Sequence, residues 1–198
     1  MSTPHLGIDA LYIACQTVVA LQALVTRCTS PVEPLIIGVG KMNAGTTYNA
    51  LAETAVLEGT TRTTSHETRE RVQNAISQVV HHTASDYGGT AEIVWTDFAA
   101  PLLNDPQVCL EVSDVVSQLW GDGHVITGRA LSLAGDNFAE YLCEMPGAYA
   151  YLGTGNSDIP CTLSPAHNGN FDIDENALVL GASLYAGVVL KKLSEKEI

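Results

Sequence analysis

Basic residues are scarce in this sequence. Only nine of its 198 residues are Lys or Arg, against 22 Asp or Glu, and the formal net charge is -13. Binding to nucleic acid depends on Lys and Arg side chains that replace counterions on phosphate, so that function is disfavoured. An anionic membrane surface is disfavoured for the same reason. The charge is typical of an acidic soluble protein.

Paired cysteines and long apolar runs are also lacking. No two cysteines form a C-x-x-C pair, which favours reduced thiols in a cytoplasmic protein. No stretch looks long and apolar enough to span a bilayer. The N-terminus has no basic segment of the signal-peptide type. We therefore expect a cytoplasmic location and no membrane partner. The cysteines are Cys15, Cys28, Cys109, Cys143 and Cys161.

Three common functional motifs are missing as well. Residues 38–45 are rich in glycine, but they have neither phosphate-loop spacing and they precede no helix. There is no G-x-S-x-G sequence, so a serine-hydrolase elbow is absent. The scattered thiols have no nearby oriented histidine, which disfavours a cysteine nucleophile.

What the sequence does contain is a core-forming composition, with 46% apolar residues, and a regular order of elements. Residues up to about 98 predict helix, strand, strand, helix, strand. One more strand in front would make the βαββαβ order of a ferredoxin-like sandwich, so we expect that fold without its first strand. The elements are a helix at 8–27 beginning near Asp9, strands at 35–39 and 54–62, a helix from a capping box at 64–67 to a glycine pair at 88–89, and a strand at 91–96.

The second half follows a linker at about 99–104. Asp105 and Pro106 are typical of a helix start, with a capping residue followed by proline. Residues 148–153 predict a buried strand, residues 157–170 a polar loop, and residues 172–193 a long helix.

A few polar residues could belong to a site, although each has an ordinary explanation. His167 is a loop histidine before the long helix. Asp136 and Asn137 could simply cap a short helix at 138–142. Asn49 is a plausible turn residue, and Arg62 a charge at a strand end.

In their order along the chain, however, the short motifs around these residues resemble one family. They are residues 4–10, 45–49, 57–62, 135–138, 146–148, and His167 with 171–175. The family is that of the metal-dependent aminoacylase/carboxypeptidase amidohydrolases, in the branch of hippurate hydrolases, N-acyl-amino-acid amidohydrolases and indole-acetyl-amino-acid hydrolases. The resemblance covers essentially the whole chain, but only the C-terminal half of such an enzyme.

The resemblance implies an α+β and α/β protein of two parts. Residues 6–100 would be a ferredoxin-like lid, often used for dimerisation, that lacks its first strand. Residues 104–198 would be the C-terminal part of the α/β catalytic domain. We therefore expect a homodimer. The helix at 172–193 would lack the sheet it normally packs on, so we also expect an exposed apolar surface and self-association, or a partner that supplies the missing half.

The resemblance also assigns roles to three residues. His167 matches the family's C-terminal metal ligand, and the complete enzymes hold two divalent metal ions, zinc or manganese. Asn49 and Arg62 match lid positions that approach the substrate, an N-acyl amino acid or small peptide-like molecule. An amide donor suits the amide oxygen, and a guanidinium suits the free carboxylate.

Several features depart from the family pattern. The usual Glu-Asp pair is Asp136-Asn137, and a frequent proline is Gly169. The other metal ligands and the general-base glutamate normally precede the lid, and this sequence contains none of them. We therefore expect an N-terminally truncated chain that does not hydrolyse amides alone. The alternatives are a non-catalytic dimerisation module and a small-molecule-binding α+β domain that needs no metal.

Overall fold

The computed structural model describes residues 2–195. The chain divides into two compact units. The first comprises Met1–Leu102 together with Ser132–Ala139, and the second comprises Leu103–Leu131 and Glu140–Ile198. Segment 132–139 therefore packs with the first unit although it lies far from it in the sequence.

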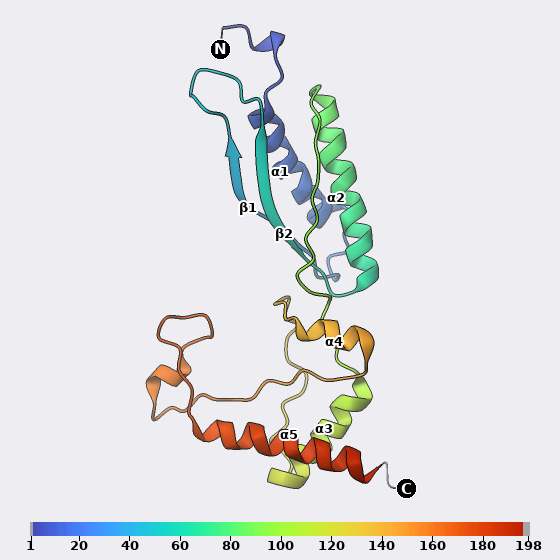
Figure 1. The fold of residues 1–198 in the computed structure, drawn as a ribbon, viewed down its shortest axis with the longest axis vertical. Helices are drawn as coiled ribbons and strands as arrows, with labels where there is room; N and C mark the ends of the chain where they lie inside the picture. Colours follow the sequence, from blue (N-terminus) through green and yellow to red (C-terminus); the bar gives the residue numbers. More distant parts are fainter. Residues whose placement is uncertain (1, 196–198) are drawn as a thin grey trace. The chain divides into compact units, whose positions relative to one another are not determined.

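The first unit contains an antiparallel hairpin of β1 (Ile36–Ala44) and β2 (Ala55–Arg62), which confirms both expected strands (Figure 1). Val39 pairs with Gly59 and Lys41 pairs with Glu58, so Gly40 is an extra residue that forms a bulge. The bulge reverses the alternation of side chains after it, because the period of a strand is two. Lys41 therefore shares a sheet face with Glu58, and its Nζ forms an ion pair at 2.5 Å with Glu58 Oε1.

Two helices cover this hairpin, α1 (Ala10–Arg27) and α2 (His66–Asp86). Asp9 caps α1 as expected, since its carboxylate accepts hydrogen bonds from the backbone N–H groups of Leu11 and Tyr12 at 3.1 and 3.4 Å. A short 3-10 helix, η1 (Pro4–Leu6), precedes α1. The core joins both helices to β1 and consists of Leu21, Leu24, Leu35, Ile37, Val72 and Ile76.

The cap of α2 differs from the predicted one by a residue. Ser65, not Thr64, is the N-cap, and its Oγ accepts a hydrogen bond from the Thr68 N–H at 3.0 Å. Both residues can cap a helix, and the sequence alone did not fix which of them begins this one. Glu67 lies in the first turn, where a carboxylate favours the helix dipole.

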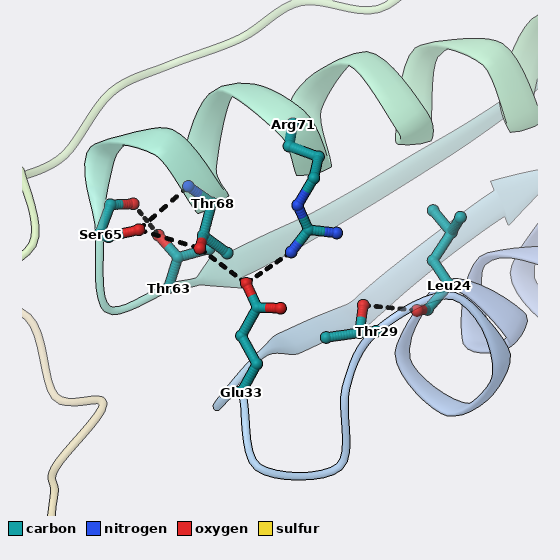
Figure 2. A network of polar contacts seen from close by, with 7 residues as sticks. All are labelled: Leu24, Thr29, Glu33, Thr63, Ser65, Thr68 and Arg71. Atoms are coloured by element: carbon teal, nitrogen blue, oxygen red, sulfur yellow. Dashed lines mark hydrogen bonds and ion pairs between the residues drawn. The ribbon is translucent and has the colours of Figure 1, made fainter.

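A polar network fixes this end of α2 to the chain that enters β1 (Figure 2). The Ser65 hydroxyl donates to Thr68 Oγ1, and Thr68 Oγ1 donates to Glu33 Oε1 at 2.7 Å. The Arg71 guanidinium donates to the same Glu33 oxygen. The Thr68 hydrogen bond, followed by the hydrogen bond and charge of Arg71, lowers the pKa of Glu33 below its ordinary value of 4.5.

The predicted strand at 91–96 is wrong. Helix α2 ends at Asp86, and Gly88 follows it with a φ of 75°, which suits glycine, but residues 91–96 form no strand. Among the described residues, no backbone–backbone hydrogen bond joins residues 90–99 to any other segment. In the split βαβ order another strand would lie between this segment and β2, and no described residue fills that position. Ile93 nevertheless packs against the core.

The second unit is largely helical, with α3 (Pro106–Trp120), η2 (Pro160–Leu163) and α5 (Asn176–Ser194). Asp105 caps α3 as predicted, accepting a hydrogen bond from Val108 N–H at 2.9 Å. Helices α3 and α5 pack closely at Gly187, where a Cβ would lie only 2.7 Å from Val115 Cγ1. Lys191 also forms an ion pair with Asp114 at 3.0 Å.

Two expectations for the second unit are wrong. Residues 148–153 form no strand, since no described segment lies beside them as a strand to complete a ladder. The long helix begins at Asn176 and not at 172, because Asp174 folds back to accept the Asn176 N–H at 3.0 Å. The short helix α4 (Phe138–Glu144) forms where a helix was expected.

The expectation that no segment could span a bilayer also needs correction. By length and hydropathy, α1 and α5 both reach the range of membrane-spanning helices. For α1 the apolar face is accounted for, because Leu21 and Leu24 lie in the core. For α5 the apolar residues are mostly exposed, as the sequence led us to expect. They include Leu178, Val179, Tyr185, Val189, Leu190 and Leu193.

Candidate functional site

Arg62 is the last residue of β2, and it is partly buried. Within the described part of the chain, its guanidinium forms no hydrogen bond or ion pair, whereas Arg69 pairs with Asp97 and Arg71 with Glu33. A guanidinium has five N–H donors, and leaving them unsatisfied in a partly buried place is unfavourable. A guanidinium of this kind could accept an anionic ligand, so Arg62 is a candidate binding residue whose role stays a prediction.

Gly135, in another segment of the first unit, lies close to both Arg62 and Phe98. A Cβ placed on Gly135 would lie 2.6 Å from Arg62 Nη1 and 3.6 Å from the Phe98 ring. Directly after Gly135, the Asp136 carboxylate accepts the Phe138 N–H at 2.8 Å, so Asp136 acts as a helix cap. The fold therefore brings the 135–138 motif to the end of β2, more than seventy residues away in the sequence.

Asn49 lies in the connection between the two strands, and its side-chain oxygen accepts a hydrogen bond from Thr47 Oγ1 at 3.1 Å. Beside it is an open hollow of about 430 Å³. Ala44 pairs with Ala55 at this end of the hairpin, whereas Arg62 pairs with Ile36 at the other end. At about 3.3 Å per residue, β2 separates the two ends by roughly 20 Å. Asn49 and Arg62 are therefore not brought together within one chain, and their roles stay predictions. The hollow is lined by Asp9, Leu11, Ala44, Gly45, Thr46, Thr47, Tyr48, Ala50 and Ala52.

His167 lies in the loop between η2 and α5, in the second unit. Its φ of 65° is in the left-handed region, which is uncommon for a residue other than glycine. Such backbone strain is often found at functional positions, where the surrounding structure holds it in place. Among the described residues, however, no group of three or more His, Cys, Asp or Glu side chains could hold a metal ion. His167 is a single candidate ligand, and these residues do not fit a two-metal site.

The loop that carries His167 is closed at its base. The Asp174 N–H donates to Thr154 O at 3.0 Å, and Asn156 Nδ2 donates to Asp174 Oδ2 at 2.8 Å. The hydrogen bond from Asn156, followed by the backbone N–H of Asn176, lowers the pKa of Asp174 below its ordinary value of 3.8. These hydrogen bonds join the two ends of the loop, as in an Ω-loop, and His167 lies between them.

Sequence reasoning did not identify several of these residues. The approach of Gly135 to Arg62 and Phe98 depends on tertiary structure that no local pattern encodes. The hydrogen bond between Asn156 and Asp174 could have been suspected from the sequence, because Asn or Asp residues on both sides of a polar loop are typical of loop closure.

Comparison with known proteins gives the following matches. The family model of the peptidase dimerisation domain, of M20 type, matches residues 1–88. N-acetyl-L-cysteine deacetylase of Bacillus subtilis is 34% identical over 89% of this chain and 40% of its own length. Thermostable carboxypeptidase 2 of Saccharolobus solfataricus is 29% identical over 96% and 47%, and N-acetyldiaminopimelate deacetylase of Geobacillus is 31% identical over 96% and 48%.

Solved structures give the same picture. The YXEP protein of Bacillus subtilis, a dinuclear metal binding peptidase from the M20 family, has a TM-score of 0.78 at 25% identity, over 94% of this chain and 46% of that one. A putative aminohydrolase from methicillin-resistant Staphylococcus aureus has a TM-score of 0.81 at 26% identity, over 96% and 48%. The chain spans about half the length of the curated relatives it matches.

Proposed function

We propose that this chain supplies the carboxylate-binding lid and one metal ligand of an N-acyl-amino-acid amidohydrolase. The reason is that it corresponds to the C-terminal half of M20-family amidohydrolases and peptidases. The observation that carries the proposal is Arg62, a partly buried guanidinium without an acceptor among residues 2–195, in a chain of net charge -13. Such a group is suited to bind a planar carboxylate through two parallel hydrogen bonds.

The substrate class follows from this anion site together with the names of the relatives. Two of these proteins are named for the deacetylation of N-acetylcysteine and N-acetyldiaminopimelate, and another is named a carboxypeptidase. Molecules of these kinds carry a free carboxylate beside the amide that is cleaved. Arg62 would bind that carboxylate. Asn49 would donate to an amide oxygen, but because it lies roughly 20 Å from Arg62, it would not bind the same small molecule as the Arg62 of its own chain.

His167 would be a ligand for zinc or manganese, both of which accept a neutral imidazole. A site for two metal ions needs several more ligands than the described residues bring together. We therefore propose that the remaining ligands and the general base come from outside these 198 residues, and that this polypeptide alone does not hydrolyse amides.

A hydrolysis assay tests this proposal. The purified 198-residue chain is incubated with N-acetyl-L-methionine and ZnCl₂ or MnCl₂, and released amine is measured. The expected rate equals that of buffer with metal. Metal-dependent hydrolysis that is lost in His167→Ala, but kept in the control His124→Ala, would contradict the proposal.

Self-association is a second function that a specific observation favours. Residues 1–88 match a dimerisation domain, and no described residue pairs with the outer edge of either strand of the hairpin. We propose a homodimer joined through a strand edge or a helix of the first unit, in a cytoplasmic protein whose described residues form no disulfide. Sedimentation over a dilution series should show a dimer, and a monomer at every concentration would contradict this.

The DNA upstream of the Met1 codon separates the two functions. An open frame with a Cys/His motif and a Glu-Glu pair would favour the amidohydrolase. A stop codon in frame close to Met1 would favour the interaction module.

A further inference from the structure

We infer that Gly135 is a positioning residue for Arg62: the missing side chain leaves the space in which the guanidinium lies. The inference rests on the proposed function, in which Arg62 binds the substrate carboxylate. It concerns a residue that touches neither the amide bond nor a metal ligand.

The backbone of Gly135 does not itself require glycine. Its φ is outside the left-handed region, unlike that of Gly45 or Gly88, which have φ values of 74° and 75°. An alanine could adopt this conformation without strain. The reason for glycine at 135 is therefore space and not backbone freedom.

The Arg62 side chain takes up that space. A Cβ on Gly135 would lie 2.6 Å from Arg62 Nη1, which is closer than nonbonded atoms approach, and 3.6 Å from the Phe98 ring, which is an ordinary contact. Of the two neighbours, only the guanidinium must move. Nη1 is the far end of a long flexible side chain, so it can move with little cost to the fold.

The backbone on the other side of this contact is fixed. The Asp136 carboxylate accepts the Phe138 N–H at 2.8 Å, and Asp136 O accepts the Ala139 N–H at 3.2 Å. Ala139 is fully buried. The turn that follows Gly135 is thus held by a cap and by a buried residue, and a methyl group at 135 would displace Arg62 and not the turn.

Displacement matters because recognition by arginine is directional. A guanidinium binds a carboxylate best when two N–H groups lie in the plane of both oxygens. A shifted guanidinium would keep its charge but lose this alignment. Gly135 would therefore affect the affinity for carboxylates without affecting stability.

The experiment uses the ¹⁵N-labelled 198-residue chain. The Nε–Hε signal of Arg62 is assigned by its loss in Arg62→Lys. Gly135→Ala is compared with wild type and with Gly38→Ala, a control in the same unit where a Cβ meets nothing within 4 Å. Each variant is measured without ligand and during titration with N-acetylglycine, and thermal unfolding is recorded.

Gly135→Ala should move the Arg62 signal in the absence of ligand, weaken N-acetylglycine binding by about tenfold or more, and leave the unfolding temperature close to that of Gly38→Ala. An Arg62 signal unchanged in ligand-free Gly135→Ala would overturn the positioning role, whatever the titration shows. A third outcome is that the Arg62 signal moves in ligand-free Gly135→Ala, but the wild-type Arg62 signal does not respond to N-acetylglycine. That outcome would reject the carboxylate site and leave the positioning role of Gly135 intact. Weaker binding in Gly38→Ala equal to that in Gly135→Ala would also overturn the inference.

Discussion

The two units of this chain differ in how they use their apolar residues. In the first unit, α1, α2 and the hairpin enclose a common core that contains Leu21, Ile37 and Ile76. In the second, α5 is as apolar as α1 but leaves most of its large side chains exposed, including Val179 and Leu190. The first unit therefore has its own hydrophobic stabilisation, whereas the second presents a surface suited to a further layer of structure.

The largest effect should come from the core of the first unit. Ile76→Ala removes a buried side chain and should reduce the free energy of unfolding by about 2–5 kcal/mol. Leu180→Ala in α5 removes a side chain that is 41% exposed, and it should cost less than about 1 kcal/mol. Urea unfolding measures both. Equal losses would mean that the two units do not differ in this way.

Next in size should be the effect of charge on the exposed face of α5. The double variant Val179→Glu, Leu190→Glu replaces two apolar residues that are 68% and 67% exposed with carboxylates. If α5 associates with another apolar surface, association beyond the proposed dimer of the first unit should weaken by about tenfold or more. Sedimentation measures this, and Val32→Glu, at 88% exposure in the first unit, is the control. Equal weakening by the control would remove the special role of α5.

The cap of α2 should give a smaller effect. Ser65→Ala removes the hydroxyl that accepts the Thr68 N–H, and it should reduce the free energy of unfolding by about 1 kcal/mol. The neighbouring Thr64→Ala should change stability by less than about 0.5 kcal/mol. Thermal unfolding of both variants distinguishes the observed cap from the predicted one, since the reverse order would place the cap at Thr64.

The smallest effect concerns pH. The pKa of Glu33 is lower in the folded chain than its ordinary value of 4.5, because Thr68 and Arg71 donate to it. Its contribution is therefore fully present above about pH 4.5 and is lost as pH falls through the lower folded value. The stability difference between wild type and Glu33→Gln should shrink over that interval in urea unfolding from pH 7 to pH 3. A difference that does not change with pH would show that Glu33 is not responsible.

Local signals in the sequence identified the elements that are stabilised locally. Asp9 and Asp105 each cap a helix as predicted, because capping involves residues only a few positions apart. The strands at 91–96 and 148–153 were predicted from alternation and composition, but neither forms. A strand needs a neighbour for its backbone groups, and no described segment supplies one at either place.

The candidate site residues divide in the same way, between features that short sequence motifs predict and features that depend on tertiary contacts. His167 and Arg62 were predicted as site residues from ordered motifs, which do not depend on tertiary contacts, and their roles stay predictions. The approach of Gly135 to Arg62 and the separation of Asn49 from Arg62 follow from the path of the chain in three dimensions. The bulge at Gly40 was not predicted either, since one extra residue in a hairpin leaves almost no trace in its sequence.

We propose that the first unit binds a carboxylate by itself, whereas His167 is a single candidate metal ligand among the described residues of the second. Calorimetric titration of the full chain with N-acetylglycine, with and without EDTA, tests it directly. The account predicts binding that is unaffected by EDTA and by His167→Ala but is lost in Arg62→Met. Binding that is lost with EDTA or in His167→Ala, and kept in Arg62→Met, would contradict it.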